Sequence, residues 1–155
     1  MSEIEPLLKT IEEADPDILL AASQYSMIHH EEDLNELFPK CAERGISVVV
    51  GSPFDAGFLA GKDRFLYWGT IPLGYKEKLA GIQKVAANHH VDVRTAALQF
   101  CAAPEVVSAV IPGSHTPQQA RENAESFFKA KIPASFWEEL KREKLIAENA
   151  PIPKG

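Results

Sequence analysis

The 155-residue sequence lacks several features that mark whole classes of protein. It has no apolar run long enough to cross a bilayer, so an integral membrane protein is not expected. Basic residues are fewer than acidic ones: the sequence has 22 Asp and Glu residues and 16 Lys and Arg residues, which gives a net charge of −6. Because no cluster of basic residues offsets this charge, a nucleic-acid partner is not expected either.

Cysteine is also scarce. Cys41 and Cys101 are the only two, and each falls in a helical apolar pattern, so we expect buried free thiols. No signal-peptide pattern opens the chain, and together these features predict a reducing compartment and a cytoplasmic location. The length and an apolar fraction of 45% fit one globular domain, residues 1–155.

Apolar periodicity predicts strands and helices in alternation. The expected strands are 18–22, 46–50 and 106–111, and the first is a continuous apolar run of the kind buried on both faces. Helical spacing predicts helices at 2–14, 31–44, 76–90, 93–100, 117–129 and after Pro133. This alternation predicts a parallel sheet that binds ligands at the carboxyl ends of its strands. Three strands are too few for a complete TIM barrel, which needs eight.

The stretch from Val106 to Asn123 joins the last expected strand to a well-marked helix. Thr116 can cap this helix, Pro117 suits its first position, and Gln119 can complete a capping box. One side of the helix carries apolar residues spaced for burial: Ala120, Ala124, Phe127 and Phe128. A helix start after a strand and a glycine turn can bind an anion. The pattern fits a phosphate site, but on local grounds an ordinary strand-to-helix turn is favoured, because well-capped turns are common.

Other polar clusters give weaker signals. His29, His30, Glu31 and Glu32 are adjacent in sequence and therefore do not share one face, and no third ligand follows at a metal-site spacing. We expect a solvated helix start there and no metal site. Asp55 has no partner at an acid–base spacing.

Three segments, in order, resemble the C-terminal half of the aldo-keto reductases. They are Gly45 to Val50; Ser52-Pro53-Phe54 with Gly57 and Leu59; and Val110 to Gly113 with Thr116-Pro117 and Glu122-Asn123. Residues 21–28 and 51–57 look most like the sugar or pyridoxal dehydrogenase branch. The resemblance implies an α/β fold, a partial TIM (β/α)8 barrel whose three parallel strands are barrel strands six to eight.

The resemblance also implies a nicotinamide cofactor, NAD or NADP, and the residues that hold it. Ser52 and Phe54 correspond to the loop that wraps the pyrophosphate. The adenosine end corresponds to four residues of the last strand-to-helix unit: Gly113, Ser114, Gln119 and Asn123. Gln24 and Tyr25 fall near the nicotinamide by position.

The departures from the family pattern concern charge and catalysis. Gly113 and Gln119 stand where many NADP-specific members carry a Lys and an Arg, and loss of a charge-assisted phosphate contact slightly favours NAD. The family's catalytic Asp, Tyr, Lys and His all come from the first half of the barrel. We therefore assign no catalytic residue here and expect no hydride transfer by this chain alone.

Two functions remain open. The first is the cofactor-binding half of an NAD(P)-dependent aldose or alcohol dehydrogenase, which acts on a small carbonyl or sugar only with the missing N-terminal half. The second is a non-catalytic protein derived from such a half that binds itself or a partner. In both cases two open sheet edges and a concave apolar face predict association, either with the N-terminal half or with a second copy.

Overall fold

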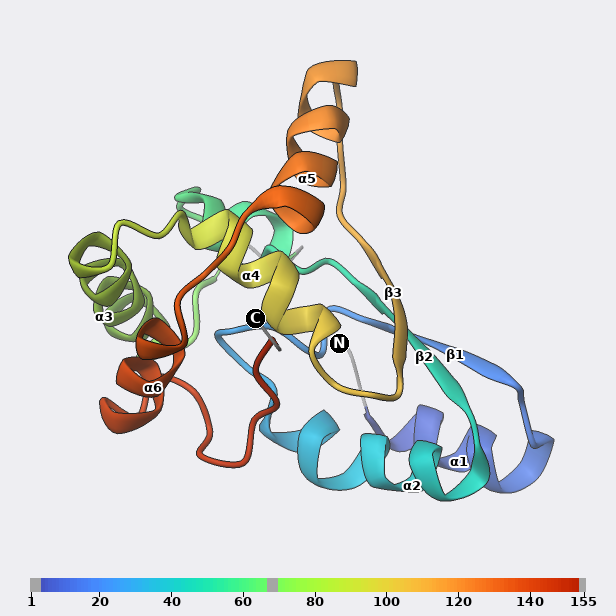
Figure 1. Ribbon diagram of the computed structural model, residues 1–155. Coiled ribbons are helices and arrows are strands. Elements are labelled where there is room, and N and C mark those ends of the chain that lie inside the picture. Colours follow the sequence, from blue (N-terminus) through green and yellow to red (C-terminus); the bar gives the residue numbers. More distant parts are fainter. Residues whose placement is uncertain (1–3, 67–69, 154–155) are drawn as a thin grey trace.

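A computed structural model describes residues 4–66 and 70–153 (Figure 1). Its three strands run parallel in the order β1, β2, β3, and segments containing helices connect them. The elements are α1 (Ile4–Ala14), β1 (Ile18–Ala22), η1 (Asp33–Leu37), α2 (Phe38–Arg44), β2 (Ser47–Gly51), η2 (Asp55–Ala60), α3 (Tyr75–Asn88), α4 (Val93–Ala102), β3 (Val107–Ile111), α5 (Pro117–Lys129) and α6 (Ala134–Arg142). All three expected strands are confirmed to within one residue at either end; the expected helix start at residue 2 lies outside the described residues.

The sheet is covered on one face only. Leu19, Val48 and Val50 point into the core beneath the helices. Ile18 and Leu20 alternate with the buried positions of β1 and remain 56% and 55% exposed. The expectation that β1 is buried on both faces is therefore wrong, because nothing in the described part of the chain covers the second face.

The expected helix 31–44 is confirmed as helical throughout, but it contains a π-helical turn just before Pro39. Residues 33–37 form one turn of π-helix, in which the N–H of Phe38 donates to the carbonyl of Asp33, and α2 follows. Pro39 has no N–H to donate, so the regular α-helical ladder cannot continue through it. Gly45 ends α2 with a left-handed φ of 69°, as the sequence predicts.

Helix α5 has less cover than its pattern predicts. Thr116 caps it by accepting from the N–H of Gln119, which is confirmed, while the Gln119 side chain accepts from His115 rather than completing the capping box. Its expected apolar side is largely open: Phe128 is 79% exposed and Ala120 is exposed. Figure 1 shows α5 extending past the end of the sheet and lying next to α4.

The expectation for the two cysteines is confirmed. Cys41 and Cys101 are buried free thiols in α2 and α4. Across residues 4–66 and 70–153, no helix is both long and apolar enough to cross a bilayer. In the same residues, no group of three or more His, Cys, Asp or Glu side chains is placed to hold a metal ion.

Candidate functional site

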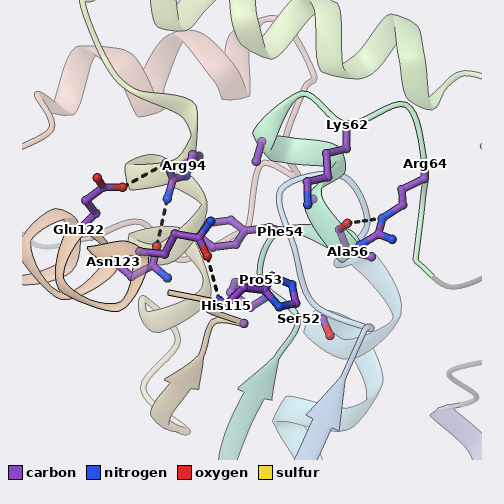
Figure 2. A pocket seen from close by; sticks show the side chains of 14 residues that line it. Ser52, Pro53, Phe54, Ala56, Lys62, Arg64, Arg94, His115, Glu122 and Asn123 are labelled. Carbon is purple, nitrogen blue, oxygen red and sulfur yellow. Dashed lines mark hydrogen bonds and ion pairs between the residues drawn. The ribbon is translucent and has the colours of Figure 1, made fainter. Parts of the chain in front are cut away.

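A pocket of about 490 Å³ lies beyond the carboxyl ends of β2 and β3 (Figure 2). One wall is the loop after β2, and the other is the start of α5 with the turn that precedes it. Five of the six residues expected to hold the cofactor line it together: Ser52, Phe54, Gly113, Gln119 and Asn123. These walls come from segments some 60 residues apart in the sequence, and the parallel pairing of β2 with β3 brings them together.

The wall from the β2 loop presents backbone and an aromatic ring. Ser52 adopts a left-handed φ of 59° directly after β2, which turns the chain across the end of the sheet. Phe54 lies in the middle of the pocket in Figure 2, half-buried, with the guanidinium of Arg94 5.9 Å from its ring centre. A flat apolar ring beside a cation suits a planar, charged ligand.

The wall from α5 is organised by Asn123. This residue is 6% exposed, accepts a hydrogen bond from Arg94 at 3.3 Å and donates to the Ser114 hydroxyl at 3.0 Å. Ser114, the sixth expected residue, lies in the adjoining groove between β3 and α5 and contacts the pocket through Asn123. A side chain added at Gly113 would meet no atom within 4 Å, so its backbone is open to a ligand.

The pocket contains cations that the sequence analysis missed. Lys62, Arg64 and Arg94 line it, against one carboxylate, Glu122, 4.0 Å from Arg94. Arg64 is fixed by donating to the carbonyl of Ala56 at 2.8 Å. These residues come from the segment after η2 and from the start of α4, not from the turn where the family motif places its cations. The only sequence signal was their position just after a glycine- and proline-rich loop and at a helix start.

This residue set fits the adenosine diphosphate portion of a dinucleotide. The volume lies within the range of small-molecule sites. The phosphates would meet the positive end of α5, a 13-residue helix, and the two cations Lys62 and Arg64. The ring of Phe54 and the polar tip of Asn123 offer an apolar surface and hydrogen-bonding groups for the adenosine.

The two residues expected near the nicotinamide do not form a comparable surface. Tyr25 is 1% exposed and its ring stacks on Phe100 in the core, 5.3 Å between centres. Burial is the main cause that raises the pKa of its hydroxyl far above the ordinary value. Gln24 lies just after β1, and its buried Oε1 has no hydrogen-bond partner within the described residues. Tyr25 is therefore a core residue.

Glu31 and Glu32 are exposed at the start of the helix, as the sequence predicts, but His30 beside them is buried and His29 is half-buried. His30 is 1% exposed; its Nδ1 lies 2.9 Å from the Ser26 carbonyl, and its Nε2 accepts from the N–H of Ala147. His29 Nε2 lies 3.1 Å from a carboxylate oxygen of Asp55, which is fully buried. For the histidines the prediction fails because helix periodicity says nothing of the C-terminal segment and the β2 loop, which fold over them.

Comparisons with known proteins identify the family of the chain. The family model described as "Aldo/keto reductase family" matches residues 2–143. A D-threo-aldose 1-dehydrogenase from a Pseudomonas species is 32% identical over 146 residues, which is 92% of this chain and 44% of that protein. A pyridoxal 4-dehydrogenase from Microbacterium luteolum is 30% identical over 151 residues, 95% of this chain and 43% of that protein. The chain thus spans a little under half the length of these curated relatives.

Solved structures give the same picture of the fold. An aldo-keto reductase from Bacillus halodurans, in its holo form, superposes with a TM-score of 0.69 at 24% identity, over 96% of this chain and 48% of that one. A glycerol dehydrogenase from Gluconobacter oxydans superposes with a TM-score of 0.63 at 16% identity, over 97% and 48%. Three parallel strands with their helices therefore correspond to about half of a TIM barrel.

Proposed function

Because the chain belongs to the aldo/keto reductase family, we propose that it is the cofactor-binding half of an NAD(P)-dependent aldose or alcohol dehydrogenase. One observation carries the proposal: five of the six expected cofactor residues line one pocket, with Lys62, Arg64 and Arg94 beside them. The names of the relatives support a small carbonyl or sugar as the substrate of the completed enzyme.

In this proposal the residues of the chain bind and orient, and do not carry the chemistry. Lys62, Arg64 and the start of α5 neutralise the pyrophosphate, while Asn123 holds the adenosine. Phe54 joins Asn123 at the adenosine, because its side chain has no hydrogen-bonding group for the pyrophosphate to which the resemblance assigns it. A bound nicotinamide cofactor would supply or accept the hydride. We assign no catalytic residue to this chain, so turnover is expected only with an N-terminal half that completes the barrel.

A cofactor titration tests the proposal. Binding of NADH and of NADPH is followed by nicotinamide fluorescence, with NAD slightly preferred because Gly113 and Gln119 supply no cation. Asn123→Ala removes the hydrogen bonds to Arg94 and Ser114 and should weaken binding about tenfold. The matched control is Asn35→Ala, an exposed asparagine whose side chain bonds only Asn149 among the described residues. Absence of binding of either cofactor at millimolar concentration would overturn the proposal.

A second function, self-association without catalysis, is favoured by the uncovered sheet face. Ile18 and Leu20 on β1 and Ile111 on β3, the two strands that flank β2, are each more than half exposed. β1 and β3 have no partner strand on their outer edges within the described residues. A second copy that covers this face would form an isologous dimer.

Light scattering at micromolar concentration tests the association. Leu20→Arg should shift the protein toward monomer, because a charge cannot be buried in an apolar interface without a partner. Leu73→Arg is the matched control, since Leu73 is fully exposed and lies outside the sheet. A wild-type protein that is already a stable monomer would exclude the second function.

A further inference from the structure

A buried polar cluster joins the loop after β2 to the segment after β1. Ser26 donates its hydroxyl proton to one oxygen of the Asp55 carboxylate at 2.7 Å, and the other oxygen lies 3.1 Å from Nε2 of His29. Asp55 has no exposed surface and Ser26 is 1% exposed. Lys78 stabilises the same segment by donating to the carbonyl of Ile28 at 2.6 Å. These contacts connect residues 26 to 50 positions apart.

The cluster contains the residue types of a hydrolytic triad in an arrangement that cannot act as one. In a triad the histidine lies between the serine and the carboxylate, whereas here Asp55 lies between Ser26 and His29. The Ser26 oxygen also accepts from the N–H of Ile28 at 3.1 Å and is closed off from solvent. The cluster therefore has a structural role, which is to hold the surrounding chain in place.

That chain is in an unusual conformation. Four residues other than glycine between 52 and 66 have φ values in the left-handed region: Ser52 at 59°, Asp55 at 50°, Ala56 at 57° and Leu66 at 49°. Side chains disfavour this region, so such a loop persists only where surrounding contacts hold it. Asp55 supplies contacts from both its side chain and its backbone, because its carbonyl accepts from the N–H of Leu66 at 3.2 Å.

The strained loop forms a wall of the proposed cofactor pocket. Ser52, Phe54, Ala56 and Gly57 line that pocket, and Asp55 is the one residue of this run whose side chain points into the core instead. A displacement of Asp55 would therefore move the residues on either side of it. Asp55 is thus held by two side-chain contacts and one backbone hydrogen bond, which suits it to keep strained backbone in place.

We propose that Asp55 is a positioning residue, which holds the loop 52–60 in its cofactor-binding shape through Ser26 and His29. The proposal rests on the proposed function for its consequence, dinucleotide binding, but the anchoring of the loop can be measured without any ligand.

Three variants of the full chain distinguish the loss of the Asp55 side-chain contacts from a change in backbone freedom. Asp55→Gly removes the side-chain contacts while it tolerates a left-handed φ. Asp55→Asn keeps both contacts, since its amide can accept from Ser26 and donate to neutral His29. The control Ala56→Gly adds the same backbone freedom at the next left-handed position and leaves the cluster intact.

Two measurements are made on each variant. The first is the rate of trypsin cleavage after Lys62 and Arg64, two exposed residues just beyond the loop, relative to global unfolding. The second is the dissociation constant of ADP-ribose, a probe that lacks the nicotinamide. Asp55→Gly should raise the cleavage rate and the dissociation constant about tenfold each, while Asp55→Asn stays within about threefold of wild type in both. Because Ala56 itself lines the pocket, Ala56→Gly is a control for the cleavage rate alone, which should stay within about threefold of wild type.

The outcomes distinguish the two proposals. If wild type binds no ADP-ribose, the proposed function fails and the cleavage rates alone decide the anchor. If Asp55→Gly and Ala56→Gly are cleaved at the same rate, or if Asp55→Asn is cleaved as fast as Asp55→Gly, the proposal that the Asp55 side chain holds the loop is overturned. If Asp55→Gly does not fold, Ser26→Ala, which removes one contact, replaces it and must accelerate cleavage more than Ala56→Gly.

Discussion

Replacing either member of the buried Asp55–His29 pair should reveal a pH dependence of stability that the intact pair conceals. Burial raises the pKa of Asp55 from 3.8 to about 7, and burial lowers the pKa of His29 from 6.5 to about 4. Between about pH 4 and about pH 6.5 the folded pair holds one titratable proton, on the carboxyl, and the unfolded pair also holds one, on the imidazole. Because proton uptake is equal in the two states, the pair adds almost no slope to stability in this window.

Asp55→Asn leaves His29 to titrate alone. Its folded pKa stays low because the causes are burial and the neighbours His30 and Lys78, none of which the change removes. In the unfolded state the His29 imidazole then takes up a proton below pH 6.5, whereas in the folded state it does so only below about pH 4. This contribution to stability is complete above pH 6.5 and is lost as the pH falls, by roughly 3 kcal/mol at about 1.4 kcal/mol per pKa unit.

His29→Gln should give the opposite slope. The remaining carboxyl of Asp55 keeps its raised folded pKa, so the folded state holds a proton that the unfolded state has lost. The contribution is complete below the unfolded pKa of 3.8 and is lost as the pH rises toward about 7, by roughly 4 kcal/mol.

Urea unfolding, followed by tryptophan fluorescence at several values between about pH 4.5 and about pH 7.5, measures both slopes. Subtracting the wild-type free energy at each pH removes the contributions of other groups, such as buried Asp33, whose pKa burial also raises to about 7. Difference curves of opposite sign are expected. Two flat curves, or two curves of the same sign, would refute the account of the pair.

Three further changes test packing, capping and a left-handed turn by urea unfolding. Phe136→Ala removes a fully buried ring and should lower the free energy of unfolding by about 3 to 5 kcal/mol. The matched control Phe128→Ala removes a ring that is 79% exposed and should change it by less than about 0.5 kcal/mol. Similar losses in the two variants would contradict the observed burial. Thr116→Ala removes the cap of α5 and should cost about 1 kcal/mol, and no loss would mean that the cap is not formed in solution. Gly45→Ala should cost about 1 kcal/mol from its φ of 69° alone, since no atom lies within 4 Å of the added carbon; a much larger loss would indicate a contact that the structure lacks.

The sequence predicts those parts of the molecule that depend on neighbours along the chain. The strands follow from short apolar runs, and Thr116 and Gly45 follow from the preferences of helix ends. The loop at Ser52 and the residues of α5 follow from a family pattern written in consecutive residues. In each case the chemistry that decides the structure lies within a few positions of the residue.

The failures share the opposite property. His30 is buried by a segment more than a hundred positions away, so its own flanking residues give no sign of burial. Asp55 and Ser26 are 29 positions apart and meet only because β1 and β2 pair in parallel. The apolar stripe of α5 fails for a different reason: Phe128 has the spacing of a buried residue, but no element among the described residues packs over it.

The charge of the proposed pocket also depends on residues that are far apart in the sequence, and it affects the choice between NAD and NADP. A preference for NAD was predicted from two positions of one wall, Gly113 and Gln119, where cations are missing. The opposite wall and the start of α4 bring Lys62, Arg64 and Arg94 into the same pocket. Any dinucleotide carries a pyrophosphate, so these cations support binding of both cofactors, and only a cation within reach of the ribose 2′-position favours NADP. We expect the slight preference for NAD to hold, because Arg94 is already bound to Asn123 and Glu122. Arg94→Met should then weaken NADH and NADPH equally, and a greater loss of NADPH binding would show that Arg94 reaches the 2′-phosphate and would refute this account.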